Sequence, residues 1–251
     1  MLILVALAEL ATDLESEVAP LAADLGVAPY EARLLLSGER PKVLLRTTDE
    51  ARARDLLGKL RARRHGVFAC DAAAIVATDD MVRPGAFTVG DVALRAEGGE
   101  ELPYVDLLGV LRAVRPHVTT TTKTVKETKL SLGRAVLTGG LLSTKKGEKE
   151  VTERVEEREQ LVYLLRRSGA TAWSVRARTA SFTGLGADMA PSFAQNLLKL
   201  VAELRRRAPD AAYDERLLRF HASSDPSGAR LDEQVHLLAI AIARAGKGPY
   251  R

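Results

Sequence analysis

Six basic residues are concentrated in one stretch of the sequence, and their type and spacing point to a binding chemistry. The stretch runs from residue 112 to residue 134, and six basic residues minus one acidic residue, Glu127, give it a local charge of +5. Guanidinium and ammonium groups bind phosphate and carboxylate groups. Along a strand, Lys123 and Lys129 would share one face because side chains alternate with a period of two. The candidate anion contacts are Arg112, Arg115, Lys123, Lys126, Lys129 and Arg134.

This basic stretch has two interpretations. One is an anion-binding face for lipid headgroups or nucleic acid. The other is a solvated sheet face whose edge lysines resist aggregation. Stacking on single-stranded nucleic acid needs interleaved aromatic side chains, and the stretch has none. We therefore rank an anionic membrane surface above nucleic acid as a partner.

The sequence contains no motif whose residue types and spacing are typical of a catalytic, metal-binding or cofactor-binding site. Residues 133–140, beginning at Gly133, lack the lysine and hydroxyl of a phosphate-binding loop, and Gly184-Leu185-Gly186 lacks the third glycine of a dinucleotide motif. We expect Cys70 to be a small buried apolar residue, His65 to favour a helix dipole, and the pair Asp79-Asp80 to lie solvated in a loop. The histidines, none paired at ligand spacing, are His65, His117, His221 and His236. The sequence thus predicts a non-enzyme with no catalytic residues, no metal and no cofactor.

The composition is that of a globular chain. The chain has 251 residues, a net charge of +4 and a pI near 9.3, with 46% hydrophobic and 4% aromatic residues. A single cysteine excludes an intramolecular disulfide and indicates a reducing compartment. The apolar run at residues 2–8 is too short to span a bilayer and is closed by Glu9. These features predict a soluble protein of the bacterial cytoplasm type, without a transmembrane segment.

The elements that position these residues fall into three parts, of which the first is residues 1–80. Apolar runs at 2–8, 42–46 and 67–70 predict strands, and 74–77 is a possible fourth strand. Helical patterns lie between them, and Thr47 with Glu50 fits a capping box. The order predicts a small βαβ-type, ferredoxin-like α/β sandwich with helices on one face.

The second part is residues 86–208, after a linker at 79–85. Short strands are predicted from 87 onward, and Trp173 begins an alternating strand opposite the apolar run 161–165. Residues 143–158 are almost wholly polar and predict a mobile loop or solvated extension. An apolar stripe running from Phe193 to Leu204 then predicts a long helix that covers Trp173. This part should be a mostly antiparallel sheet or barrel capped by that helix, which makes the chain α+β overall.

This order of elements resembles a pleckstrin-homology-like domain. The resemblance rests on Phe87-Thr88-Val89, Leu102-Pro103-Tyr104, the Trp173 strand and the helix between Pro191 and Arg207. It implies binding of lipid headgroups, peptides or other proteins, and it carries over no binding residues. The polar segment 143–158 departs from a compact member of that family.

The third part, residues 209–251, is a tail whose apolar stripe at Leu231, Val235, Leu238 and Ile242 must dock on the body or on a second subunit. The sequence leaves the oligomeric state open. It favours a non-catalytic binding or regulatory protein that contacts another protein through residues 86–208. The alternatives are an anionic-surface binder using the 112–134 stretch, and an enzyme whose site forms between domains.

Overall fold

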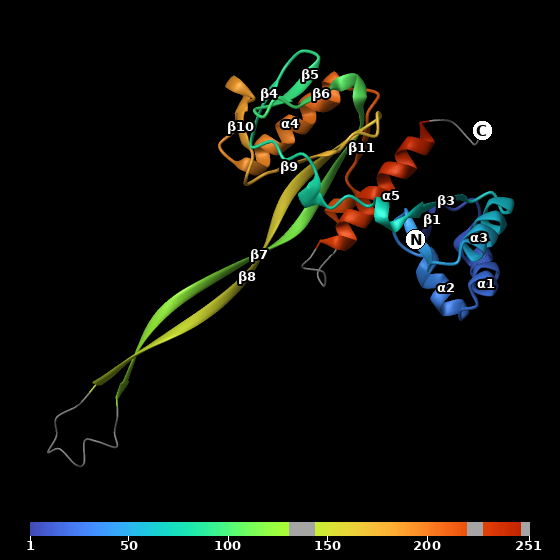
Figure 1. Cartoon of the computed structure of the whole chain (residues 1–251), viewed down its shortest axis with the longest axis horizontal. Coiled ribbons are helices and arrows are strands. Elements are labelled where there is room, and N and C mark those ends of the chain that lie inside the picture. Colours follow the sequence, from blue (N-terminus) through green and yellow to red (C-terminus); the bar gives the residue numbers. More distant parts are fainter. Residues whose placement is uncertain (131–143, 220–227, 247–251) are drawn as a thin grey trace. The chain divides into compact units, whose positions relative to one another are not determined.

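The computed structural model describes residues 1–130, 144–219 and 228–246, and within 116–130 and 144–157 it describes the backbone. The chain divides into two compact units. The first comprises Met1–Arg115 and Glu159–Arg251, and the second is Pro116–Arg158. The described residues form a mixed α/β fold with five α-helices and three open sheets, so their strands do not close a barrel (Figure 1).

The N-terminal sheet is three-stranded, in the order β2-β1-β3, and β1 pairs antiparallel with both neighbours. Its strands are β1 (Ile3–Glu9), β2 (Lys42–Thr47) and β3 (Gly66–Asp71). Three helices connect them: α1 (Leu14–Leu25), α2 (Pro29–Leu36) and α3 (Glu50–Ala62). Alternate β1 residues, Ile3, Val5 and Leu7, pack with the buried residues of all three helices, which therefore cover one face of the sheet.

Two local predictions for this part are wrong. The N-cap of α3 is Asp49, whose carboxylate accepts a hydrogen bond from the Arg52 N–H at 3.1 Å, and the Thr47 hydroxyl accepts one from the Asp49 N–H. The fourth strand expected at 74–77 does not form. Ala72–Ala74 is a 3-10 turn, and residues 75–77 are not in a strand. The carboxylate of Asp71 accepts from the Ala73 N–H at 3.0 Å, and this side-chain bond turns the chain out of the sheet.

The following part holds two four-stranded sheets. One has the order β10-β4-β5-β6, with β4 antiparallel to β5 and parallel to β10, and the other has the order β11-β7-β8-β9. The strands of the first are β4 (Ala86–Val89), β5 (Ala93–Ala96), β6 (Glu101–Pro103) and β10 (Ser181–Gly184). Those of the second are β7 (Leu107–Leu130), β8 (Thr144–Arg166), β9 (Trp173–Arg176) and β11 (Ala212–Asp214).

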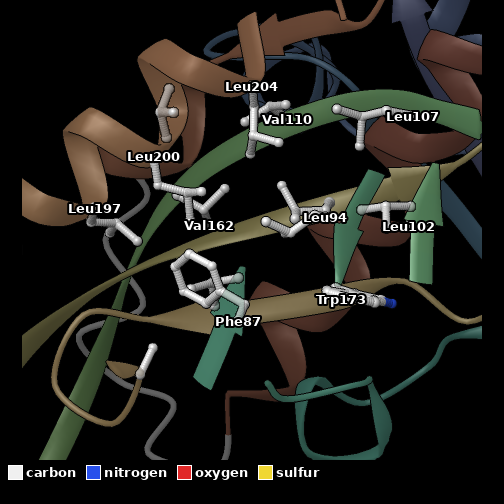
Figure 2. Packing of buried hydrophobic residues seen from close by; sticks show 14 of the residues in the cluster. Phe87, Leu94, Leu102, Leu107, Val110, Val162, Trp173, Leu197, Leu200 and Leu204 are labelled. Atoms are coloured by element: carbon white, nitrogen blue, oxygen red, sulfur yellow. The ribbon is translucent and has the colours of Figure 1, made fainter. Parts of the chain in front are cut away.

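One apolar core joins both sheets to the long helix α4 (Phe193–Arg207). Figure 2 shows Phe87 and Leu94 of the first sheet, Val162 of the second and Leu200 of the helix converging in this core. Trp173 is fully buried within it, as predicted. The prediction that Phe193 helps to cover Trp173 is wrong, because Phe193 is 59% exposed at the first turn of α4. The apolar stripe thus extends one turn beyond the core.

The C-terminal helix α5 (Ala229–Ala245) packs against two parts of the first unit. Leu231, Val235 and Leu238 join a core with Leu111 of β7 and Tyr163 of β8. On a neighbouring face of the same helix, Leu237 packs with Ala6 of β1 and Phe68 of β3. The tail therefore docks on the body of its own chain, and it covers the sheet face opposite to α1, α2 and α3.

The second unit is a two-stranded β-ribbon. Within Pro116–Arg158, the outer parts of β7 and β8 are hydrogen-bonded neighbours that wind around one another (Figure 1). The loop predicted at 143–158 is therefore wrong for its described residues, which are strand. A polar sequence forms this strand because cross-strand hydrogen bonds to β7 satisfy its backbone without a buried face.

Candidate functional site

The first two candidate anion contacts lie in the first unit, and both are close to carboxylates. Arg112 donates to the carboxylate of Glu215 and lies 3.4 Å from the Tyr213 hydroxyl. The Tyr213 hydroxyl and Arg112 both donate to Glu215, and these bonds hold the pKa of Glu215 below its ordinary value. The two terminal nitrogens of Arg115 each lie 3.4 Å from an Asp79 carboxylate oxygen. An added anion would therefore compete with a carboxylate at either arginine.

The other four candidates lie farther along the chain. Lys123, Lys126 and Lys129 belong to the ribbon strand β7, whose backbone is described there, and Arg134 lies outside the described residues. The two described side chains, Arg112 and Arg115, are held by different carboxylates. Anion contact by these six residues stays a prediction.

Asp79 is the centre of an arginine cluster that the sequence did not reveal. Its carboxylate accepts from Arg176 of β9 at 2.5 Å, is contacted by Arg115, and lies 3.5 Å from Arg83. The hydrogen bond from Arg176 is the largest cause of the lowered pKa of Asp79. The expectation of a merely solvated acidic loop is therefore wrong for Asp79, although its side chain remains 56% exposed.

The residues after Asp79 also pair with the sheet. The Val82 N–H donates to the Ala172 carbonyl at 3.0 Å, and the Ser174 N–H donates to the Val82 carbonyl at 2.8 Å. Val82 forms a parallel bridge with Trp173, the first residue of β9. The segment expected as a linker thus covers part of the edge of β9.

A buried polar network lies next to this segment. The Asp232 carboxylate of α5 accepts hydrogen bonds from the Thr78 hydroxyl and from the Thr78 N–H, the latter at 3.1 Å. The Thr78 hydroxyl also lies 2.8 Å from the Tyr163 hydroxyl of β8, and burial raises the pKa of Tyr163. Each of these polar groups has a partner within the network, which therefore fastens α5 to β8. Sequence spacing gave no signal, because Thr78 and Asp232 are 154 positions apart.

A second polar network lies in the N-terminal part. His65 was expected to serve a helix dipole, but its side chain is fully buried. Its Nδ1 accepts from the Ala11 N–H at 3.1 Å, and its Nε2 lies 3.0 Å from Glu17. Arg63 bridges Glu17 at 2.9 Å and Asp24 at 2.6 Å. The dipole interpretation is therefore wrong, and His65 ties the connection after β1 to the start of β3.

The remaining reactive side chains show little activation. Cys70 is partly buried, and burial is the largest cause of its raised pKa, which favours the thiol over the nucleophilic thiolate. Burial lowers the pKa of His236 and so favours the neutral imidazole. Among the described residues, no group of three or more His, Cys, Asp or Glu side chains is placed to hold a metal ion.

Two exposed apolar residues lie at the junction that leads into α4. Met189 is 52% exposed and Phe193 is 59% exposed. The side-chain amide of Asn196, in the first turn of α4, accepts from the Ala190 N–H at 2.6 Å and donates to the Ala190 carbonyl at 3.0 Å, which fixes the junction. Methionine and aromatic side chains are enriched in protein interfaces, so this junction is a small candidate contact surface.

The ribbon presents the longest candidate contact surface, namely its two strand edges. β9 pairs with β8 only at Leu161–Leu164, and β11 pairs with β7 only at Gly109–Leu111. Within 116–130 and 144–158, the described strands therefore have only each other as hydrogen-bonded neighbours. Such an edge carries a row of backbone N–H and C=O groups that can pair with another strand.

Comparisons with protein-family models, with curated proteins and with solved structures found no match to this chain. The helices in the described part of the chain lack the combination of length and apolar character needed to cross a membrane. The candidate contact surfaces in the described part of the chain are the two edges of the ribbon and the junction at Met189 and Phe193.

Proposed function

We propose that this chain is a non-catalytic binding or regulatory protein that contacts another protein through residues 86–208, with the β7–β8 ribbon as the contacting element. In this proposal the N-terminal part is a ferredoxin-like support and residues 86–208 are a pleckstrin-homology-like module extended by the ribbon. The open edges of the ribbon are the observation that carries the proposal.

Energetics support a binding role for the ribbon. Ordering the backbone costs about 1–2 kcal/mol per residue, whereas a favourable cross-strand pair contributes roughly 0.2–1 kcal/mol. An isolated two-stranded ribbon is therefore marginal in water. A further strand added along either edge would satisfy backbone groups and add cross-strand pairs, so the ribbon gains most from a partner that supplies a strand.

Charge favours a protein partner over an anionic surface. Residues 116–130 and 144–158 together carry eight Lys and Arg residues and six Glu residues, a net charge of +2. Attraction to phosphate-rich surfaces needs clustered positive charge that is not offset locally. At the base of β7, Arg112 and Arg115 are in contact with carboxylates. A mixed-charge ribbon is better suited to another mixed-charge strand.

Site-specific photo-crosslinking in lysate of the producing cells tests this function. A photoreactive amino acid placed at Thr121 or at Thr122 samples both ribbon faces, because neighbouring strand residues face opposite sides. The same amino acid at Arg54, exposed on α3, is the matched control. The proposal predicts discrete protein adducts from the ribbon positions and none from Arg54. Adducts from neither ribbon position, together with cosedimentation with phosphatidylserine vesicles, would instead support the anionic-surface alternative.

A further inference from the structure

The outer part of β8 has a charge sequence that is inverted about its centre. On the N-terminal side of Val151, residues 144–150 carry three lysines and two glutamates, and on the C-terminal side residues 152–158 carry three glutamates and two arginines. Each charged residue at a given distance before Val151 has an oppositely charged residue at the same distance after it, wherever both positions are charged. The four pairs are Lys145 and Glu157, Lys146 and Glu156, Glu148 and Arg154, and Lys149 and Glu153.

We infer that the β8 edge of the ribbon pairs antiparallel with the β8 edge of a second copy of this chain, about a two-fold axis at Val151. In this register each of the four pairs forms twice, which gives eight opposite-charge pairs and no like-charge pair. Opposite charges directly across neighbouring strands are stabilising, and like charges are destabilising. Two of the four pairs lie at odd-numbered positions and two at even-numbered positions, so both faces of the combined sheet are balanced.

The charges also select this register against its neighbours. A shift of two residues in one direction places Lys146 opposite Arg154 and Glu150 opposite Glu150 of the other copy. The same shift in the other direction places Lys146 opposite Arg158 and Glu148 opposite Glu156. Parallel in-register pairing would oppose every charge with itself. The sequence therefore specifies one antiparallel alignment, which a strand needs when it has no buried face to fix its register.

The strand arrangement leaves this edge open to a second copy. β9 begins to pair with β8 at Leu161, beyond the inverted segment, and β7 occupies the other side of β8. Pairing two ribbons would create a four-stranded sheet, β7-β8-β8-β7, through a closed two-fold interface in which both copies use the same surface. This inference rests on the proposed function, since it names a second copy as the partner of one ribbon edge; the β7 edge stays open to other proteins.

Sedimentation equilibrium of the full-length chain tests the inference. The wild-type chain should dimerise, and the dimer should weaken when salt is raised from about 0.05 M to 1 M, because screening shortens the range of charge interactions to about 3 Å. The variant Lys145→Glu/Lys149→Glu places Glu opposite Glu157 and Glu153. Its dimer dissociation constant should rise at least about tenfold, since each 1.4 kcal/mol is a factor of ten. The variant Glu153→Lys/Glu157→Lys should be impaired equally.

Mixing these two variants is the decisive measurement. In the mixed pair, every glutamate at positions 145, 149, 153 and 157 of one copy lies opposite a lysine of the other copy, so a heterodimer of wild-type strength should form. The control Arg54→Glu/Arg61→Glu makes the same charge change on exposed α3 positions and should dimerise normally.

A monomeric wild-type chain, reversal variants that still dimerise, or a mixture that stays monomeric would each overturn the inference. Rescue by mixing also shows that the variants fold, because an unfolded ribbon could not be restored by a second variant. Crosslinking from Thr121 or Thr122 to a different protein would leave the proposed function standing even if self-pairing failed, so the two failures are distinguishable.

Discussion

Gly184 lies where two backbones approach most closely, and the substitution Gly184→Ala should therefore be strongly destabilising. Gly184 ends β10 and pairs in parallel with Thr88 of β4. A Cβ atom at this position would lie 1.8 Å from the Phe87 carbonyl oxygen and 3.0 Å from the Thr88 Cα. The first distance is roughly half the separation of about 3.5–4.0 Å at which non-bonded heavy atoms attract. Both atoms belong to the backbone, so a rotamer change cannot relieve the overlap.

The magnitude follows from the displacement of one strand. Inserting a carbon into a well-packed site costs typically 1–3 kcal/mol, and we expect about 3 kcal/mol because β10 must move away from β4. Trp173 is the only tryptophan and lies buried in the same core, so its fluorescence reports unfolding of this part. With a slope of about 2 kcal/mol per M of urea, the midpoint should fall by about 1.5 M.

Gly85→Ala is the matched control, because Gly85 adjoins β4 and a Cβ there meets nothing within 4 Å. Its free energy of unfolding should stay within about 0.5 kcal/mol of wild type. If Gly184→Ala is as stable as Gly85→Ala, the close approach of β10 to β4 and the parallel pairing that produces it are both wrong.

Four further substitutions test other contacts. Trp173→Ala should lower the free energy of unfolding by about 3–5 kcal/mol, measured by urea unfolding followed by circular dichroism. Native wild-type fluorescence that acrylamide quenches readily would contradict the burial of this side chain. Asp232→Ala removes the acceptor for the buried N–H and hydroxyl of Thr78, so it should cost about 1–3 kcal/mol, and a double-mutant cycle with Thr78→Val should be non-additive. Arg64 has φ 66°, a left-handed conformation that costs a non-glycine residue about 1–2 kcal/mol, so Arg64→Gly should raise the melting temperature; a lower value would argue against that conformation. Hydrogen bonds from two arginines lower the pKa of Glu203 from 4.5 to about 2, so its stabilising contribution is present above pH 4.5 and is lost as pH falls towards 2; Glu203→Gln should flatten that part of the stability–pH curve, and an unchanged curve would contradict the shift.

Helices could be predicted from the sequence where the helical period of apolar residues and a local start or stop signal indicate the same element. The apolar stripe of Leu197, Leu200 and Leu204 predicted α4, which ends at Arg207, two residues before the helix-breaking Pro209. The helix α2 begins at Pro29 and ends at Leu36, and proline at the first helical position is a local start signal that the sequence carries.

The failures have two physical causes. Contacts such as that of Thr78 with Asp232 join residues far apart in the sequence that only the complete fold brings together, so a single sequence cannot predict them. The segment 143–158 was misread because its polarity suggested a loop, whereas a paired strand needs backbone partners and not a buried face. Phe193 shows the converse error, since an apolar residue in register with a core stripe is exposed at the end of its helix.

The packing of α5 has a consequence for synthesis on the ribosome. The sheet face that carries Ala6 and Phe68 is covered by Leu237, which is translated long after both of these strands. Chains emerge at about 5–20 residues per second, and N-terminal parts fold first. At this rate, roughly ten seconds or more pass between the synthesis of β3 and that of Leu237. One apolar face of the N-terminal sheet stays uncovered during this interval, and chaperones can bind it. Full burial of the N-terminal sheet thus depends on the synthesis of α5.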